Sequence, residues 1–276
     1  MKLAKRLAKI LIGSLIVLIG AVNLWGALTM GTLVPAQNPE LDLAANKVVM
    51  VFGATGSVGD GLLKAVLNSS DVDTVHVVTR RTSPRIDAAA KDGKLVLHIQ
   101  SDFTDYTGLK EVLPQVNTVL WGLGTTSIGM DPDTYTRIHV DFPVTFVSAW
   151  LAERSDGPMA FHYVTGIGTG EDEDARWAQD KGRAERLVAE MAEGTGLRSF
   201  GHRSAYIRPT SEQSNAGTYI LEWLLRPGDQ VIRATALGQA MLEISARTTE
   251  LANGTLIDNA DAIAYADAYE ERHPDE

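Results

Sequence analysis

The sequence predicts an α/β protein with a doubly wound parallel sheet, and two observations support this fold class. From Asn46 onward, short runs of β-branched and apolar residues alternate with longer helix-like stretches. A loop with three glycines, VFGATGSVG at 51–59, stands where the first apolar run meets the first helical stretch. Strands separated by helices form βαβ units, and their right-handed crossovers build a parallel sheet covered on both faces.

The N-terminal segment precedes this alternating pattern and has a different character. It opens with four cations, Lys2, Lys5, Arg6 and Lys9. No charged residue follows until Glu40, and a helix needs about 20 apolar residues to cross a bilayer. We therefore expect residues 1–35 to be a single-pass anchor that contacts the membrane through residues 10–34. A cleaved signal peptide and a re-entrant or surface-lying segment are the alternatives, although the apolar run is long for a signal core.

Two arguments about the side of the membrane conflict. The cations precede the segment and only Glu40 and Asp42 follow it closely, so the positive-inside rule sends the domain away from the cytoplasm. A nicotinamide cofactor would instead require the cytosol. Both placements stay open.

The expected elements follow in chain order. Residues 36–46 form a polar linker, and residues 47–276 form one domain whose final part, about 210–276, is a small extension on the substrate side. The expected strands are 47–53, 74–80, 94–100, 117–123, 160–166 and 197–209. The expected helices are 58–67, 133–152, 175–193 and 217–228. We expect the apolar residues of the last helix to pack in the core; an apolar pocket for a lipophilic substrate is the alternative.

Composition excludes several classes of function. The chain has 276 residues, 45% of them hydrophobic, which is enough for a sizeable core. Cysteine is absent, so thiolate catalysis, iron–sulfur clusters and cysteine zinc sites are excluded. The formal net charge of −10 argues against a nucleic-acid partner. The six histidines lack metal-ligand spacing, so we expect no metal site.

The glycine loop has the spacing of a dinucleotide-binding turn. Gly53 permits a tight turn off the strand, Gly56 lets the backbone approach a pyrophosphate, and Gly59 lets the helix pack close to the sheet. The helix N-terminus adds free N–H groups and the positive end of a dipole. The residues predicted to hold the pyrophosphate are Gly53, Ala54, Thr55, Gly56, Ser57, Val58 and Gly59.

At this point the sequence resembles a known family. GATGSVG is similar to the nucleotide loop of the short-chain dehydrogenase/reductase superfamily. The resemblance extends to the atypical and extended members, including the Tat-interacting-protein-like reductases, and covers roughly residues 46–270. The further matching segments are WGLGTTS (121–127), DKGRAE (180–185), YIRP (206–209) and LIDNADAIAYA (256–266). The resemblance implies a Rossmann-type fold and a nicotinamide cofactor.

The end of the second expected strand favours NADP(H) as that cofactor. NAD-binding relatives place a carboxylate there for the ribose 2′-hydroxyl, whereas this strand ends Thr79-Arg80-Arg81. Two guanidiniums match the geometry of a 2′-phosphate. The alternative is that both arginines only cover the surface at the strand end.

Two further segments are implied by the resemblance as cofactor contacts. Asp102 and Phe103, after the third expected strand, correspond to the adenine contact, with a plain strand-end turn as the alternative. Leu123, Gly124 and Thr125 end the fourth expected strand, where the backbone would pass the cofactor ribose.

The catalytic residues depart from the family pattern. The resemblance implies Tyr-x-x-x-Lys, whose tyrosine moves the proton, together with hydroxyl residues at the end of the fifth strand. Here the lysine is Lys181, but the tyrosine position holds Trp177, whose indole is not a general acid. Of the paired hydroxyl residues only Thr165 is kept, beside Gly166. We expect Lys181 to hold the nicotinamide ribose and Thr165 to orient a substrate oxygen. The alternative for Lys181 is a solvated helix face, because KGRAER is also ordinary charge patterning.

Two functions remain open. The first is an oxidoreductase that transfers hydride to or from a carbonyl or conjugated double bond of a small or lipophilic substrate. The second is an NADP(H)-binding redox sensor or assembly scaffold without turnover, which Trp177 favours. An isomerase or dehydratase of the extended type is a weaker third candidate. Proton donors other than the missing tyrosine could be Tyr135, Asp180 or Lys181, or Tyr163, which we expect to be core.

Overall fold

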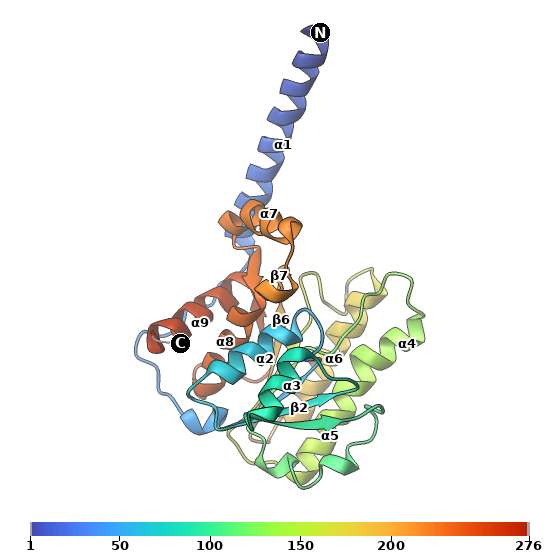
Figure 1. The fold of residues 1–276 in the computed structure, drawn as a ribbon, viewed down its shortest axis with the longest axis vertical. Helices are drawn as coiled ribbons and strands as arrows, with labels where there is room; N and C mark the ends of the chain where they lie inside the picture. Colours follow the sequence, from blue (N-terminus) through green and yellow to red (C-terminus); the bar gives the residue numbers. More distant parts are fainter. Residues whose placement is uncertain (1, 275–276) are drawn as a thin grey trace.

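A seven-stranded parallel sheet organises the computed structural model, which describes residues 2–274 (Figure 1). The strand order is β3-β2-β1-β4-β5-β6-β9, so the chain winds outward from β1 in both directions. The strands are β1 (Val48–Phe52), β2 (Thr74–Thr79), β3 (Leu95–Ile99), β4 (Thr118–Trp121), β5 (Met159–Val164), β6 (Leu197–Arg203) and β9 (Thr255–Asp258). This arrangement confirms the predicted doubly wound fold.

One strand prediction was incorrect, and one strand of the main sheet was not predicted. The expected strand 197–209 is broken, because β6 ends at Arg203 and β7 (Tyr206–Arg208) pairs with β8 (Val231–Arg233) in a separate two-stranded sheet. The backbone between β6 and β7 bonds elsewhere: the Ser204 carbonyl accepts from Ile167 N at 3.0 Å. The seventh strand, β9, was missed because four residues are too few to show an alternating pattern.

Helices cover both faces of the sheet, as alternating strand residues require. Val49 and Val51 of β1 face one apolar cluster, whereas Met50 and Phe52 face the other. The first cluster contains residues of α2 (Gly59–Asn68), α3 (Pro84–Lys91), α8 (Ala234–Ala246) and α9 (Asn259–Arg272). The second contains residues of α5 (Phe142–Glu153) and α6 (Arg176–Ala192).

The expected helix 133–152 is divided into three parts. α4 (Pro132–Thr136) passes into a π-helical segment, Arg137–Asp141, which continues as α5. A π-helical turn adds a residue to the helix and changes the direction of its side chains, and such turns are frequent at functional sites. Short 3₁₀ turns complete the described elements at Leu43–Asn46, Thr107–Leu109, Leu113–Gln115, Ser211–Gln213 and Arg226–Gly228.

The N-terminal helix α1 (Lys2–Thr29) projects from the domain (Figure 1). Its segment Lys5–Thr29 contains an 18-residue window with a mean hydropathy of 2.2 and is long and apolar enough to span a membrane. Within the following segment, 36–46, Asn46 is buried and its Nδ2 donates to Leu242 O of α8 at 2.7 Å.

Helix α7 (Ala216–Leu225) confirms the expected helix but corrects its packing. None of its residues is buried, and four apolar side chains are exposed: Tyr219, Ile220, Leu221 and Trp223. The expectation that they pack in the core was wrong. α7 connects β7 to β8, the two strands of the small sheet, and does not connect strands of the main sheet.

Candidate functional site

The glycine loop joins the carboxyl end of β1 to the N-terminus of α2. Gly53 has a φ of +75°. A Cβ atom at this position would lie 2.4 Å from the carbonyl oxygen of Gly122, the residue that follows β4. A Cβ atom on Gly59 would lie 2.1 Å from Gly53 O. Any side chain at either position would collide with backbone, so both positions require glycine. The loop and the start of α2 therefore pack as closely as a dinucleotide-binding turn does.

The N-terminus of α2 is open to solvent and able to receive an anion. Gly56 and Ser57 are exposed, and Val58, the N-cap residue, provides no side-chain cap. The buried carboxylate of Asp60 in the first turn does not cancel the dipole, because Arg85 Nε donates to it at 2.8 Å and a threonine hydroxyl donates at 2.7 Å. The residues present thus fit a pyrophosphate.

The predicted 2′-phosphate contacts lie beside this loop. β2 pairs with β1, and Arg80 and Arg81 are exposed directly after β2. Thr79 Oγ1 donates to Arg81 O at 2.8 Å and stabilises the turn. No acidic residue occurs between Thr79 and Arg85.

The residues after β3 form a local turn. The Asp102 carboxylate accepts from Thr104 Oγ1 at 2.6 Å and Thr104 N at 2.9 Å, and these hydrogen bonds lower the pKa of Asp102. Phe103 is buried, with its ring 5.5 Å from that of Phe142 and 6.3 Å from that of Phe52. These contacts match the strand-end turn that was the alternative interpretation, and an adenine contact stays a prediction.

Helix α6 brings Lys181 to the carboxyl end of β5. Its Nζ donates a hydrogen bond to the backbone carbonyl of Thr165. Burial lowers the pKa of Lys181 to about 8, although the negative charge of Glu185 raises it. Lys181 therefore stays protonated at neutral pH but loses its proton far more readily than an exposed lysine.

The Thr165 hydroxyl belongs to a buried network of hydrogen bonds. Its Oγ1 donates to Glu185 Oε1 at 2.7 Å, and Glu185 Oε2 accepts from Arg203 Nη2 at 2.7 Å. Gly201 makes room for the carboxylate, since a Cβ atom there would lie 2.4 Å from Glu185 Oε1. Glu185 is thus the nearer acceptor of the hydroxyl proton, and the His202 carbonyl oxygen, 3.3 Å from Oγ1, is a second one. The role of Thr165 in orienting a substrate oxygen stays a prediction.

Trp177 lies one turn before Lys181 on α6 and is half-buried. A Cβ atom on Gly168 would lie 3.8 Å from Trp177 Cη2, so the indole packs beside the loop that follows β5. The position therefore places a large ring near the site and no phenol.

Sequence reasoning missed His139, which is buried in the π-helical segment. Its Nδ1 lies 3.2 Å from Tyr163 Oη, and Tyr163 Oη donates to His139 O at 2.9 Å. Its Nε2 lies 3.2 Å from both the backbone nitrogen and the carbonyl oxygen of Thr125, so either ring nitrogen can carry the proton of the neutral imidazole. Burial, and then the charge of Lys181, lower the pKa of His139 to about 4.

His139 therefore ties the loop after β4 to β5 next to Lys181. A Cβ atom on Gly124 would lie 2.8 Å from His139 Cε1, so the loop packs directly on the ring. The sequence did not indicate this role, because His139 is a single histidine within an apolar stretch. The spacing of apolar residues also does not reveal the π-helical turn that contains it. Tyr163 is buried as expected, and its hydroxyl also holds His139.

Tyr135 is poorly matched to proton donation at neutral pH, and the Asp180 carboxylate already has hydrogen-bond partners. Burial, and then Asp180, raise the pKa of Tyr135 to about 12, with its ring 4.2 Å from that of His139. The Asp180 carboxylate already accepts from Thr136 Oγ1 at 2.7 Å and Arg183 Nη2 at 3.2 Å. Efficient acid catalysis needs a pKa near the working pH. Lys181 comes closest to that condition.

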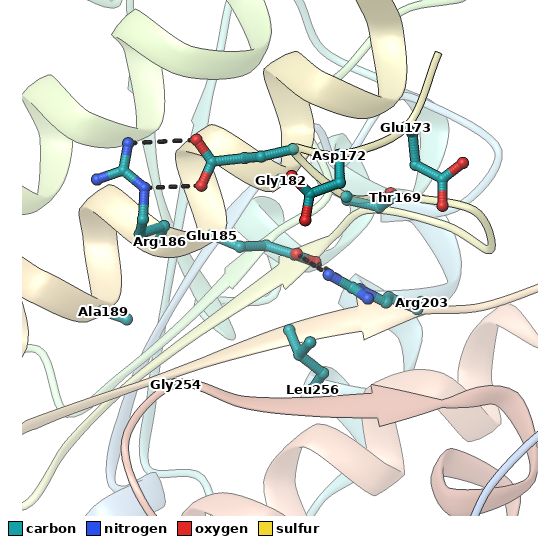
Figure 2. Close-up of a pocket in the computed structure, with 12 residues that line it drawn as sticks. Thr169, Asp172, Glu173, Gly182, Glu185, Arg186, Ala189, Arg203, Gly254 and Leu256 are labelled. Carbon is teal, nitrogen blue, oxygen red and sulfur yellow. Dashed lines mark hydrogen bonds and ion pairs between the residues drawn. The ribbon is translucent and has the colours of Figure 1, made fainter. Parts of the chain in front are cut away.

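A cleft of about 460 Å³ adjoins the same network (Figure 2). Glu185 and Arg203 point toward each other there, and Arg186 pairs with Glu171, Nε to Oε1, at 2.7 Å. Asp172 and Glu173 add to its acidic lining, which does not suit phosphates. The cleft therefore differs from the predicted cofactor site. Within residues 2–274 we find no group of three or more His, Asp or Glu placed to hold a metal ion.

Comparisons with known proteins are consistent with this geometry. No family model matches the chain. Protein FMP52, mitochondrial, from Chaetomium globosum is 36% identical over 124 residues, which is 44% of this chain and 49% of that protein. The chain thus spans about half the length of the curated relatives it matches.

Solved structures share the fold. An oxidoreductase of the short-chain dehydrogenase/reductase family from Burkholderia thailandensis aligns with a TM-score of 0.59 at 17% identity, covering 83% of this chain and 98% of that one. A 3-oxoacyl-[acyl-carrier protein] reductase from Brucella melitensis, in complex with NAD, aligns with a TM-score of 0.55 at 17% identity, covering 79% and 98%. At this identity the likeness shows the fold alone.

Proposed function

We propose that this chain is a membrane-anchored, NADP(H)-binding oxidoreductase related to the short-chain dehydrogenases/reductases. The observation that carries the proposal is one juxtaposition at the carboxyl edge of the sheet. Gly53 and Gly59 pack backbone against backbone in the turn before α2, whose N-terminus has no side-chain cap. Lys181 of α6 reaches the end of β5, a strand of the same sheet. Ligands of doubly wound sheets bind at this edge.

NADP(H) is the preferred cofactor in this proposal. Arg80 and Arg81 are exposed after β2, next to the glycine loop, with no carboxylate to grip a 2′-hydroxyl. Guanidinium groups bind phosphate through paired, charge-assisted hydrogen bonds. A free 2′-hydroxyl offers no such partner, so we expect NADH to bind more weakly.

Lys181 carries the polar chemistry of the proposed site. A nicotinamide cofactor, when bound, supplies or accepts the hydride. The Lys181 ammonium donates to the nicotinamide ribose while Thr165 O keeps its Nζ in place. Because burial brings its pKa to about 8, Lys181 is also the proton source best matched to neutral pH in the absence of a tyrosine at position 177. Small or lipophilic carbonyls and conjugated double bonds are the proposed substrates.

Trp177 supports a second candidate function, the binding of NADP(H) without turnover. Its indole occupies the family's proton-donor position and packs beside the loop after β5. A redox sensor or a membrane-tethered scaffold would keep the glycine loop and Lys181 for cofactor binding, and would lack the tyrosine that donates the proton.

The two functions are separated by one experiment on the full chain in detergent micelles. NADPH and NADH are titrated by fluorescence, and NADPH oxidation is then followed with a panel of polar and lipophilic carbonyls for the native protein and for Trp177→Tyr. Turnover by the native protein supports the oxidoreductase. Tight NADPH binding with turnover only in Trp177→Tyr supports the sensor or scaffold. Failure to bind either nucleotide contradicts both.

A further inference from the structure

Helix α7 presents its charged side to the protein and its apolar side to the outside. Arg208 Nε lies 2.7 Å from Glu222 Oε2, and both side chains are largely buried. By contrast, the side chains of Ile220 and Trp223 are 59% and 74% exposed. A surface helix in water shows the opposite arrangement, with its apolar stripe against the core. The orientation of α7 is therefore typical of a helix whose outer face meets an apolar medium.

The final third of α1 is docked beside α7. Asn23 Nδ2 donates to Leu224 O of α7 at 2.9 Å, and Gln230 Nε2 donates to Val22 O at 2.8 Å. A Cβ atom on Gly228 would lie 2.5 Å from Asn23 Cα, so the 3₁₀ turn that follows α7, Arg226–Gly228, is in direct backbone contact with α1. Figure 1 shows α7 beside the base of α1, where α1 leaves the domain.

The length of α1 sets the depth of this contact if α1 spans a bilayer. The uncharged residues before the docked part, 10–21, rise about 18 Å at about 1.5 Å per residue, whereas the hydrocarbon layer is about 30 Å thick. Residues 22–29 add about 12 Å, which completes the layer. Extending the span in the other direction would bring Lys5, Arg6 and Lys9 into hydrocarbon, which is unfavourable. The part of α1 that contacts α7 therefore lies at the end of the hydrocarbon layer nearest the domain, next to the headgroups.

We propose that α7 is a second membrane-contacting element, an interfacial helix whose Ile220 and Trp223 face the phospholipids of the bilayer that α1 spans. This inference rests on the membrane anchoring proposed above. An interfacial helix places its apolar face about 5–10 Å into the boundary between headgroups and acyl chains. Trp25 on α1 is also exposed, and tryptophan is enriched at that boundary. The bilayer, and not a second copy of the chain, is the occupant of this face.

The absence of cysteine allows a direct test by site-specific labelling. We would attach the environment-sensitive dye NBD to the full chain at Ile220→Cys, with Leu18→Cys on α1 as the reporter of the anchor. Ser148→Cys, on the exposed face of α5, is the matched control. Each protein is reconstituted into phosphatidylcholine–phosphatidylglycerol vesicles with and without doxyl-labelled lipid.

The proposal predicts blue-shifted emission and several-fold quenching by doxyl lipid at positions 18 and 220, and neither effect at 148. Quenching at 18 without quenching at 220 would leave the anchor standing and overturn the role of α7. Emission at 220 that is blue-shifted but unaffected by doxyl lipid would assign the face to a second copy of the chain, and would also overturn it. Lack of quenching at 18 would refute the anchor and this inference together.

Discussion

Lys181 Nζ donates a hydrogen bond to the backbone carbonyl of Thr165, so a helix side chain is held against the carboxyl end of the neighbouring strand β5. The contact keeps an ammonium group in a buried position at the edge where ligands of doubly wound sheets bind. Glu185, one turn further along α6, compensates part of its charge and also accepts from Thr165 Oγ1.

Replacing Lys181 by methionine should weaken NADPH binding. A hydrogen bond from a charged group contributes about 1.5–3 kcal/mol, so we expect the Kd to rise about 10- to 100-fold. Thermal stability should change little, because a buried charge is lost together with its hydrogen bond. Fluorescence titration with the control Lys94→Met, at an exposed position, checks this. An unchanged Kd would contradict the assignment of Lys181 to the ribose.

NADPH affinity should fall as the pH rises through about 8. The folded-state pKa of Lys181 lies below its ordinary value of 10.5, so the charged form is lost from about pH 8 upward. Stability changes in the opposite direction: between about pH 8 and 10.5 the unfolded chain binds more protons at this site, so its contribution to folding becomes more favourable. Kd measured from pH 6.5 to 9.5, alongside Lys181→Arg, tests the assignment. The arginine variant should lose the dependence.

Replacing Arg80 and Arg81 together by alanine should lower cofactor discrimination. The loss of paired guanidinium contacts should raise the Kd for NADPH about 10- to 100-fold and leave the Kd for NADH nearly unchanged. Parallel titrations with both nucleotides give the ratio directly. If both affinities fell equally, the two arginines would be acting on the turn after β2 and not on the 2′-phosphate.

Removing the His139 ring should uncouple the loop after β4 from β5. In His139→Phe the Thr125 N–H and the Tyr163 hydroxyl each lose a partner, at a cost of about 1–3 kcal/mol. Denaturant unfolding of the single variants and of the double variant with Tyr163→Phe should give a coupling energy of about 1 kcal/mol. Strict additivity of the two changes would show that the contact is not energetically coupled.

Gly201→Ala should displace the Glu185 carboxylate. The added Cβ atom would lie 2.4 Å from Glu185 Oε1, so the network of Thr165 and Arg203 must shift, at an expected cost of about 1–3 kcal/mol. Gly108→Ala is the matched control, since nothing lies within 4 Å of a Cβ atom there. Thermal unfolding of both variants measures the difference, and equal stability would mean that Glu185 adapts freely.

Local patterns in the sequence determined the fold class and the place of the glycine loop at the first strand–helix junction. Alternation of apolar residues places strands and helices, and the spacing of Gly53, Gly56 and Gly59 has one compact solution at a strand–helix junction. The break of 197–209 into two strands was not visible, because it depends on where the Ser204 backbone finds its hydrogen-bond partner.

Only the tertiary structure decided which groups meet around Lys181 and which side of α7 faces outward. His139 lies next to Lys181 because a π-helical turn redirects its ring, and no spacing in the sequence encodes that turn. The sequence pattern of α7 is the same whether its apolar residues face a core or a membrane, so the pattern does not distinguish the two. The exposure of these residues accompanies the ion pair of Glu222 with Arg208, which lies on the inward side of the helix. Composition and residue spacing indicate local preferences for helix or strand. Ion pairs and contacts between distant segments form only when the chain folds.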